Sequence, residues 1–77
     1  MKQWHPCKRR ILIKRLRKLG FNGPFSGTRH QFMIFGYHRL SIPSNREYSL
    51  PQLHMMLNEV ELILERSITA NEWNSLA

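Results

Sequence analysis

Arg29 and His30 are the residues of this chain whose types and positions best suit chemistry. They stand side by side at the start of an aromatic and β-branched stretch, RHQFMIF (29–35), directly after the small residues of SGT (26–28). Histidine suits general acid–base catalysis because it titrates near neutral pH, and arginine holds phosphate through paired N–H donors. Cleavage of RNA needs both functions, because the substrate carries its own nucleophile, the ribose 2′-hydroxyl. These residues therefore predict a ribonuclease site, and a histidine that merely packs near Phe32 stays the alternative.

Positive charge is concentrated in the first part of the chain. The 77 residues contain 12 Lys and Arg against five acidic residues, which gives a net charge of +7. Residues 1–46 hold eleven of the basic residues and no acidic one, whereas residues 47–77 hold one Arg and all five Glu. A basic half attracts a polyanion and an acidic half repels it. We therefore expect contact with a nucleic acid or with an acidic protein.

A basic amphipathic helix is predicted over residues 6–19. Pro6 is tolerated in a first helical turn and Gly20 supplies a stop. Arg9 falls inside the apolar stripe of this helix, at the first turn, where its side chain can reach solvent. The cations on the other side, predicted to track the RNA backbone, are Lys8, Arg10, Lys14, Arg15, Arg17 and Lys18. Ile11 lies among these cations and is predicted to be exposed, either incidentally or as half of a contact with a partner.

Two or three antiparallel strands are predicted after this helix. The segment LGFNGPFSG (19–27) predicts a turn followed by at most a short extended segment, because it contains three glycines and a proline. The aromatic stretch that begins at Arg29 then pairs with HRLSIP (38–43) around the turn Gly36-Tyr37. SNREYS (44–49) is predicted to be a polar loop.

Two helices are predicted in the acidic part of the chain. Ser49 is a candidate N-cap for a helix whose apolar residues repeat at helical spacing as far as Leu64. Thr69 and Glu72 have the spacing of a capping box, which predicts a short helix over residues 70–76. Together with the preceding elements, this order predicts a single α+β domain with its helices on one face of the sheet.

Length and composition predict the number of domains, the compartment and the absence of cofactors. A chain of residues 1–77 makes one domain with a thin core. Its lone Cys7 fits a reducing compartment, and no long apolar segment is present, so we expect a cytoplasmic protein without membrane contact. Cys7 lies among basic residues near a predicted helix start, which lowers a thiol pKa, but we expect it to be inert. The four histidines lack zinc-site spacing, so we expect no metal and no cofactor.

Several segments, in order, resemble the HicA family of toxin–antitoxin systems. These segments are IKRLRKLGF (13–21), SGTRHQFM (26–33), RLSIP (39–43) and SLPQLHMML (49–57). The resemblance covers roughly residues 8–64 and leaves the tail that contains Trp73 outside it. It implies a double-stranded-RNA-binding-domain-like fold, α-β-β-β-α, here with a short extra C-terminal helix. It also implies a type II toxin, a metal-independent endoribonuclease that cleaves mRNA and is held inactive by a HicB-like antitoxin.

The resemblance implies His30 as the catalytic residue, with Thr28 and Arg29 positioning the phosphate. The family signature is Gly-Ser-His, whereas Gly27-Thr28 is followed here by Arg29, and His30 comes one position later. Because successive strand residues point to opposite faces, either a bulge or turn restores His30 to the active position or Arg29 occupies it. After the third strand the family often has Pro-x-His. Asn45 stands in that place here, and it can donate a hydrogen bond to substrate but cannot shuttle protons.

Two alternatives from other functional classes stay open. A non-catalytic RNA-binding module of the same fold would use the basic helix and the strands, and it would bind RNA without forming product. An interaction protein would turn its basic face to an acidic partner and never touch RNA. Binding of an antitoxin would suit both the toxin and the interaction protein, so a partner alone does not separate them.

Overall fold

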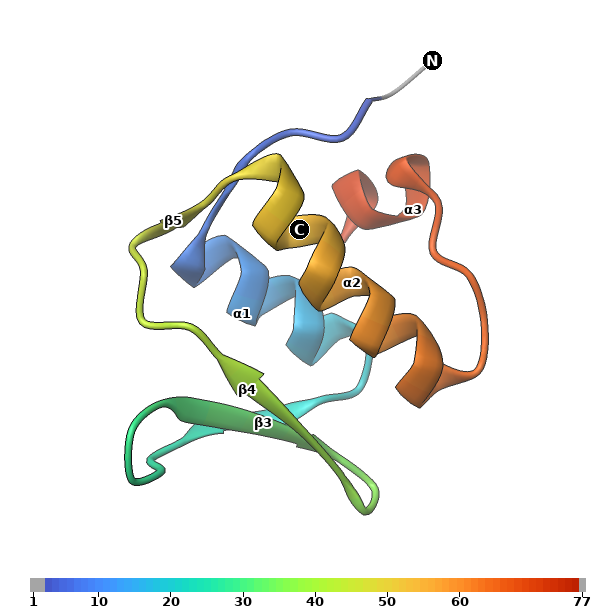
Figure 1. Cartoon of the computed structure of the whole chain (residues 1–77). Coiled ribbons are helices and arrows are strands. Elements are labelled where there is room, and N and C mark those ends of the chain that lie inside the picture. The colour runs from blue at the N-terminus through green and yellow to red at the C-terminus, as the bar shows by residue number, and fades with distance from the viewer. Residues whose placement is uncertain (1–2, 77) are drawn as a thin grey trace.

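The computed structural model describes residues 3–76 and places the helices on one face of a three-stranded antiparallel sheet (Figure 1). The elements in chain order are β1 (Cys7–Lys8), α1 (Arg9–Lys18), β2 (Asn22–Phe25), β3 (Gln31–Phe35), β4 (His38–Ile42), β5 (Glu47–Tyr48), α2 (Leu50–Leu64) and α3 (Ala70–Ser75). The sheet has the order β2-β3-β4, and β1 pairs with β5 in a separate two-stranded ribbon. The prediction of a small α+β domain with a helix, a sheet and two further helices is confirmed.

Helix α1 begins at Arg9 and not at Pro6, so the predicted start was wrong. The two residues of β1 are extended and pair antiparallel with β5, and the Arg9 N–H donates to the Arg46 carbonyl oxygen at 2.9 Å. The ribbon thus supplies partners to backbone groups that a first helical turn leaves unpaired. The prediction of a loop over residues 44–49 was wrong at β5 for the same reason, since this pairing joins segments far apart in the sequence.

The hairpin of β3 and β4 has the predicted two-residue turn. Phe35 pairs with His38 on either side of Gly36 and Tyr37, and the register continues directly to Gln31 opposite Ile42. β2 adds the third strand, which the sequence had left open, and its pairing with β3 shifts register within β2. The alternation along β3 and β4 turns one set of side chains toward the helices and the other away from them.

β3 begins at Gln31, whereas the sequence predicted a strand from Arg29. Residues 28–30 form a bend before the strand. A turn ahead of the strand was one of the two possibilities that the shifted position of His30 left open. The bend frees Arg29 and His30 from the strict alternation of strand residues.

A single core joins the sheet to all three helices. The buried apolar side chains are Cys7, Leu12, Ile13, Leu16, Phe21, Met33, Leu40, Ile42, Tyr48, Leu53, Met56, Leu57, Val60, Ile68 and Trp73. Trp73 is only 1% exposed, so the C-terminal tail belongs to the folded domain. Ile11 is half-buried and packs against this core. The prediction that Ile11 is exposed was therefore wrong, because its side chain packs against the core.

Helix α2 starts where its cap predicted. The Ser49 hydroxyl accepts a hydrogen bond from the Gln52 N–H at 3.4 Å, and Pro51 occupies the first turn, where a missing N–H costs no helical hydrogen bond. Over residues 3–76, none of the helices is long and apolar enough to cross a membrane.

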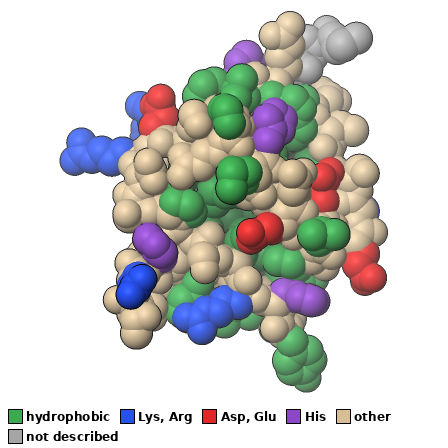
Figure 2. Space-filling model, viewed as in Figure 1, with side chains coloured by type: hydrophobic (Ala, Val, Ile, Leu, Met, Phe, Trp, Pro, Cys, Tyr) green, Lys and Arg blue, Asp and Glu red, His purple; other side chains and the backbone are tan. Residues whose placement is uncertain are grey.

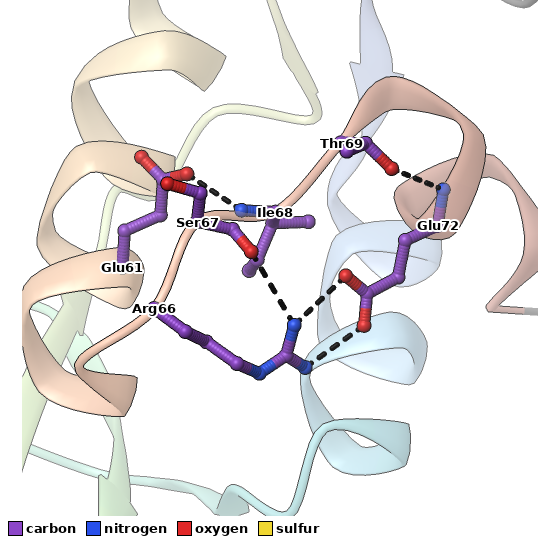
Figure 3. Close-up of polar contacts among 6 residues, drawn as sticks. All are labelled: Glu61, Arg66, Ser67, Ile68, Thr69 and Glu72. Atoms are coloured by element: carbon purple, nitrogen blue, oxygen red, sulfur yellow. Dashed lines mark hydrogen bonds and ion pairs between the residues drawn. The ribbon is translucent and has the colours of Figure 1, made fainter.

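Polar contacts fix the connection from α2 to α3 (Figure 3). The Thr69 hydroxyl accepts a hydrogen bond from the Glu72 N–H at 3.1 Å, as the capping box predicted. The Glu72 carboxylate accepts two hydrogen bonds from the Arg66 guanidinium, both at 2.8 Å. The Glu61 carboxylate accepts one from the Ile68 N–H at 2.7 Å. These bonds hold the segment that brings Trp73 onto the core.

Candidate nucleic-acid interface

The bend at residues 28–30 opens onto a concavity of about 220 Å³. The lining residues are Gly27, Thr28, Arg29, His30, Phe32, Arg39 and Ser41. The structure therefore brings together the three residues of the predicted catalytic and phosphate-binding set, Thr28, Arg29 and His30. All three are exposed, so an incoming phosphate can reach them directly. Within residues 3–76, the lining contains two arginines and no carboxylate, which makes it attractive to an anion.

Gly27 holds the bend close to the strand that follows it. A Cβ atom at this position would lie 2.5 Å from the His30 carbonyl oxygen and 3.5 Å from a guanidinium nitrogen of Arg39. Real Cβ atoms do not approach a backbone oxygen so closely. The glycine thus allows the chain to fold back on itself at the point where Arg29 and His30 are presented.

Sequence patterns did not single out Phe32 and Arg39, although both line the same concavity. The Arg39 guanidinium carbon lies 3.5 Å from the centre of the Phe32 ring, and the Phe25 ring centre lies 5.7 Å from that of Phe32. Their neighbours Met33 and Leu40 point into the core, so Phe32 and Arg39 lie on the opposite, outer face of the sheet. The two-residue turn was the available signal, because it determines the register that makes these side chains neighbours.

The basic face of α1 lines a second, larger concavity of about 710 Å³. Its lining residues are Lys8, Arg9, Arg10, Ile13, Arg17, Pro24, Arg46 and Glu47. Three of the six predicted backbone contacts, Lys8, Arg10 and Arg17, therefore lie together here. Lys14 and Lys18 are exposed on the same helix but outside this concavity.

Two arginines connect α1 to the sheet. The Arg9 side chain is half-buried and donates a hydrogen bond to the Gln31 side chain, so it stays partly exposed to solvent but is held against the sheet. The Arg17 Nε donates to the Gly23 carbonyl oxygen at 2.8 Å. Because Gln31 directly follows His30, the Arg9 contact ties the basic helix to the bend that presents His30.

Arg15 and Asn45 lie apart from both concavities. The Arg15 guanidinium carbon lies 5.4 Å from the centre of the Trp73 ring, so this cation packs against α3. The Asn45 side-chain oxygen accepts a hydrogen bond from the Gln52 amide at 3.4 Å. Neither residue lines the concavity that contains His30.

Cys7 and His54 lie away from the concavity that contains His30. Cys7 is buried, and burial raises the pKa of its thiol, while Arg15 offsets part of this effect and Glu47 adds to it. The expectation of a lowered thiol pKa was therefore wrong. His54 packs edge-on against Trp4, with ring centres 5.3 Å apart. Across residues 3–76, no three His, Cys, Asp or Glu side chains are grouped so that they could hold a metal ion.

Charge is unevenly spread over the surface. Figure 2 shows Lys and Arg side chains along the left and lower edges of one face, whereas acidic side chains lie at its centre and right and at one point on its upper left. The acidic residues of the chain lie at positions 47, 59, 61, 65 and 72, mainly on α2 and the segments that flank it. The basic concavities are formed mainly by α1, the bend and the outer side of the sheet, and Glu47 of β5 also lines the larger of the two.

Comparisons with protein-family models, with curated proteins and with solved structures find no match to this chain.

Proposed function

We propose that this chain is a HicA-like endoribonuclease with a double-stranded-RNA-binding-domain-like fold. The observation that carries the proposal is the concavity in which Thr28, Arg29 and His30 lie together without a carboxylate. The hydrogen bond between Arg9 and Gln31 joins this bend to α1, whose basic face lines the larger concavity. A phosphodiester backbone would follow the cations of the helix and reach His30 at the bend.

The proposed reaction needs no group beyond the substrate and these side chains. The ribose 2′-hydroxyl attacks the adjacent phosphorus, the bond to the 5′-oxygen breaks, and a 2′,3′-cyclic phosphate and a 5′-hydroxyl result. His30 takes the proton from the 2′-hydroxyl as it attacks and then gives it to the departing 5′-oxygen. Arg29, with its fork of N–H donors, and the Thr28 hydroxyl stabilise the charge that develops on the phosphoryl oxygens.

In the biological setting that we propose, the substrate is mRNA and the chain is the toxin of a type II toxin–antitoxin pair. A HicB-like antitoxin would inhibit it by covering the basic concavities. An acidic surface on that partner would complement the charge of α1 and would speed the association.

A non-catalytic RNA-binding module is the second candidate, and one observation favours it. No carboxylate lines the His30 concavity, so no acidic side chain there orients the imidazole or stabilises its charged form. In this case the same cations would bind RNA, and His30 would serve as one more contact.

The test is incubation of a mixed-sequence RNA with the parent protein, with His30→Ala and with His38→Ala, all in EDTA. His38 is the matched control, since it is an exposed histidine on the same sheet but outside the concavity. We expect the parent and His38→Ala to leave 2′,3′-cyclic phosphate ends and His30→Ala to leave none. Cleavage by all three proteins would show that His30 is not the catalytic residue. RNA binding without cleavage by the parent would favour the binding module.

A further inference from the structure

We infer that the outer face of the sheet carries a binding site for an unpaired nucleobase, so that the RNA bound by this chain is single-stranded at the bend. The site consists of Phe25, Phe32 and Arg39, beside the concavity that contains His30. The inference rests on the proposed function in one respect, namely that RNA is the ligand.

The first argument is the exposure of aromatic surface on a face that no helix covers. The helices all lie on the other side of the sheet (Figure 1). Phe25 is 43% exposed, and its ring leans on that of Phe32 with 37° between the ring planes. A ring held in place by a neighbouring ring offers a planar apolar surface with little rotamer freedom left to lose. Such surfaces bind bases by stacking, irrespective of base identity.

The second argument is the position of Arg39. Its guanidinium carbon lies 3.5 Å from the centre of the Phe32 ring, so one face of the guanidinium plane is covered by the ring. The residue is exposed and lines the concavity, so its remaining surface is accessible to a ligand. Bases stack on guanidinium planes as well as on aromatic rings. Arg39 therefore continues the stacking surface from Phe32 into the concavity.

The third argument is the polarity of the concavity beside this surface. Thr28 and Ser41 bring hydroxyls, while Arg29 and His30 bring N–H donors. Hydroxyls can donate to or accept from the polar edge of any base. A nucleotide could thus place its base on the aromatic surface and its phosphate at the bend. The absence of carboxylates from the lining removes the repulsion that would oppose the phosphate.

This arrangement distinguishes unpaired RNA from a duplex. In an A-form helix the bases are stacked on one another, and their faces are closed to protein side chains. A base can reach Phe25 and Arg39 only where the strand is open. The basic face of α1 contacts backbone charge in either form, so the sheet face is the part of the molecule that would select single strands.

The test measures the binding of two fluorescent 2′-O-methyl oligonucleotides of equal length, one with all its bases and one abasic at every position. Both resist cleavage through the 2′-hydroxyl, and both carry the same phosphate charge. The proteins compared are the parent, Phe25→Ala, Arg39→Lys and the control Tyr37→Ala. Tyr37 is a fully exposed aromatic residue at the hairpin turn and does not line the concavity.

We expect Phe25→Ala to bind the complete oligonucleotide about tenfold more weakly and to bind the abasic one nearly as the parent does, since stacking is lost only where a base is present. Arg39→Lys keeps the charge but loses the planar stacking group, and we expect the same pattern from it. Tyr37→Ala should match the parent on both ligands. Circular dichroism melts of each variant verify that the fold is retained.

Either of two results would overturn the inference. One is equal binding of both oligonucleotides by the parent, and the other is a loss of affinity for both alike in the Phe25 and Arg39 variants. The proposed function has a separate readout, because His30-dependent cleavage of natural RNA can persist when the base site is absent. Failure of the parent to bind or cleave any RNA would instead contradict the proposed function itself.

Discussion

The Arg9 side chain of α1 donates a hydrogen bond to the side chain of Gln31, the residue that directly follows His30. This contact joins the basic helix to the first residue of β3. The cations of α1 and the bend are therefore held at a fixed spacing, as an RNA backbone that runs from one to the other would require.

Loss of this contact should weaken the proposed catalysis more than the fold. For Gln31→Ala we expect a loss of about 1 kcal/mol in the free energy of unfolding, the usual effect of one hydrogen bond. We expect cleavage of RNA to fall several-fold, since the bend is less well positioned. Gln52→Ala is the matched control, because it removes an exposed amide contact, to Asn45, outside the His30 concavity. Equal cleavage by both variants would contradict the positioning role of Arg9 and Gln31.

The bend should be sensitive to the smallest added side chain. Gly27→Ala places a methyl group against the His30 carbonyl oxygen, so the bend must shift. Displacement of a catalytic group by about 1 Å can cost up to about 100-fold in rate, and we expect a loss of cleavage approaching this size. Gly36→Ala is the comparison, since its positive φ of 60° makes it destabilising by about 1–2 kcal/mol while nothing crowds its Cβ. It should retain cleavage, measured below its melting temperature.

The exposed cations of α1 should determine the salt dependence of RNA binding. We expect joint replacement of Arg10, Lys14 and Lys18 by Gln to weaken binding and to reduce the slope of log K against log salt by about 2. Affinity at several salt concentrations gives this slope. Replacement of Glu65 by Gln changes the charge at the C-terminal end of α2, away from both concavities, and should leave the slope unchanged. An unaltered slope in the α1 variant would show that RNA does not follow this helix.

Trp73 should contribute strongly to stability through packing and little through its N–H. Its ring is buried, and within residues 3–76 the structure gives the indole N–H no acceptor. We expect Trp73→Ala to cost about 3–5 kcal/mol in the free energy of unfolding. Trp73→Phe should cost much less, because it keeps an aromatic ring under Arg15 and breaks no hydrogen bond. Urea denaturation of the two variants measures the difference, and equal losses would mean that the indole N–H is bonded.

The ion pair of Arg66 and Glu72 should make a small, pH-dependent contribution to stability. The hydrogen bonds that the Glu72 carboxylate accepts from Arg66 lower the pKa of this carboxyl group. A carboxyl whose pKa is lower in the folded state stabilises that state above the unfolded pKa, and this stabilisation disappears as the pH falls through the folded pKa. Melting temperatures of the parent and Glu72→Gln should therefore differ slightly at pH 7 and converge below the ordinary glutamate range. A constant difference from pH 7 to pH 3 would contradict this account.

Local features of the chain were predictable from the sequence because they depend on neighbours along it. Hydrophobic spacing identified α2, the Ser49 cap set its start, and Thr69 identified the start of α3. The turn at Gly36-Tyr37 set the register of β3 and β4 in the same way. Each depends on hydrogen bonds or packing within a few residues, which periodicity and turn residues report directly.

Long-range contacts decided the rest. The start of α1 moved because β1 pairs with β5, and the Arg9 side chain bonds to Gln31 because β3 lies beside it. The sequence determined that Arg29 and His30 stand together in a basic half-chain, directly after the small residues of SGT (26–28). Only the tertiary structure decided that they lie on a bend held by Gly27, with Phe32 and Arg39 beside them. The physical reason is that strand pairing brings distant backbone groups together, and no local pattern in either segment records its partner.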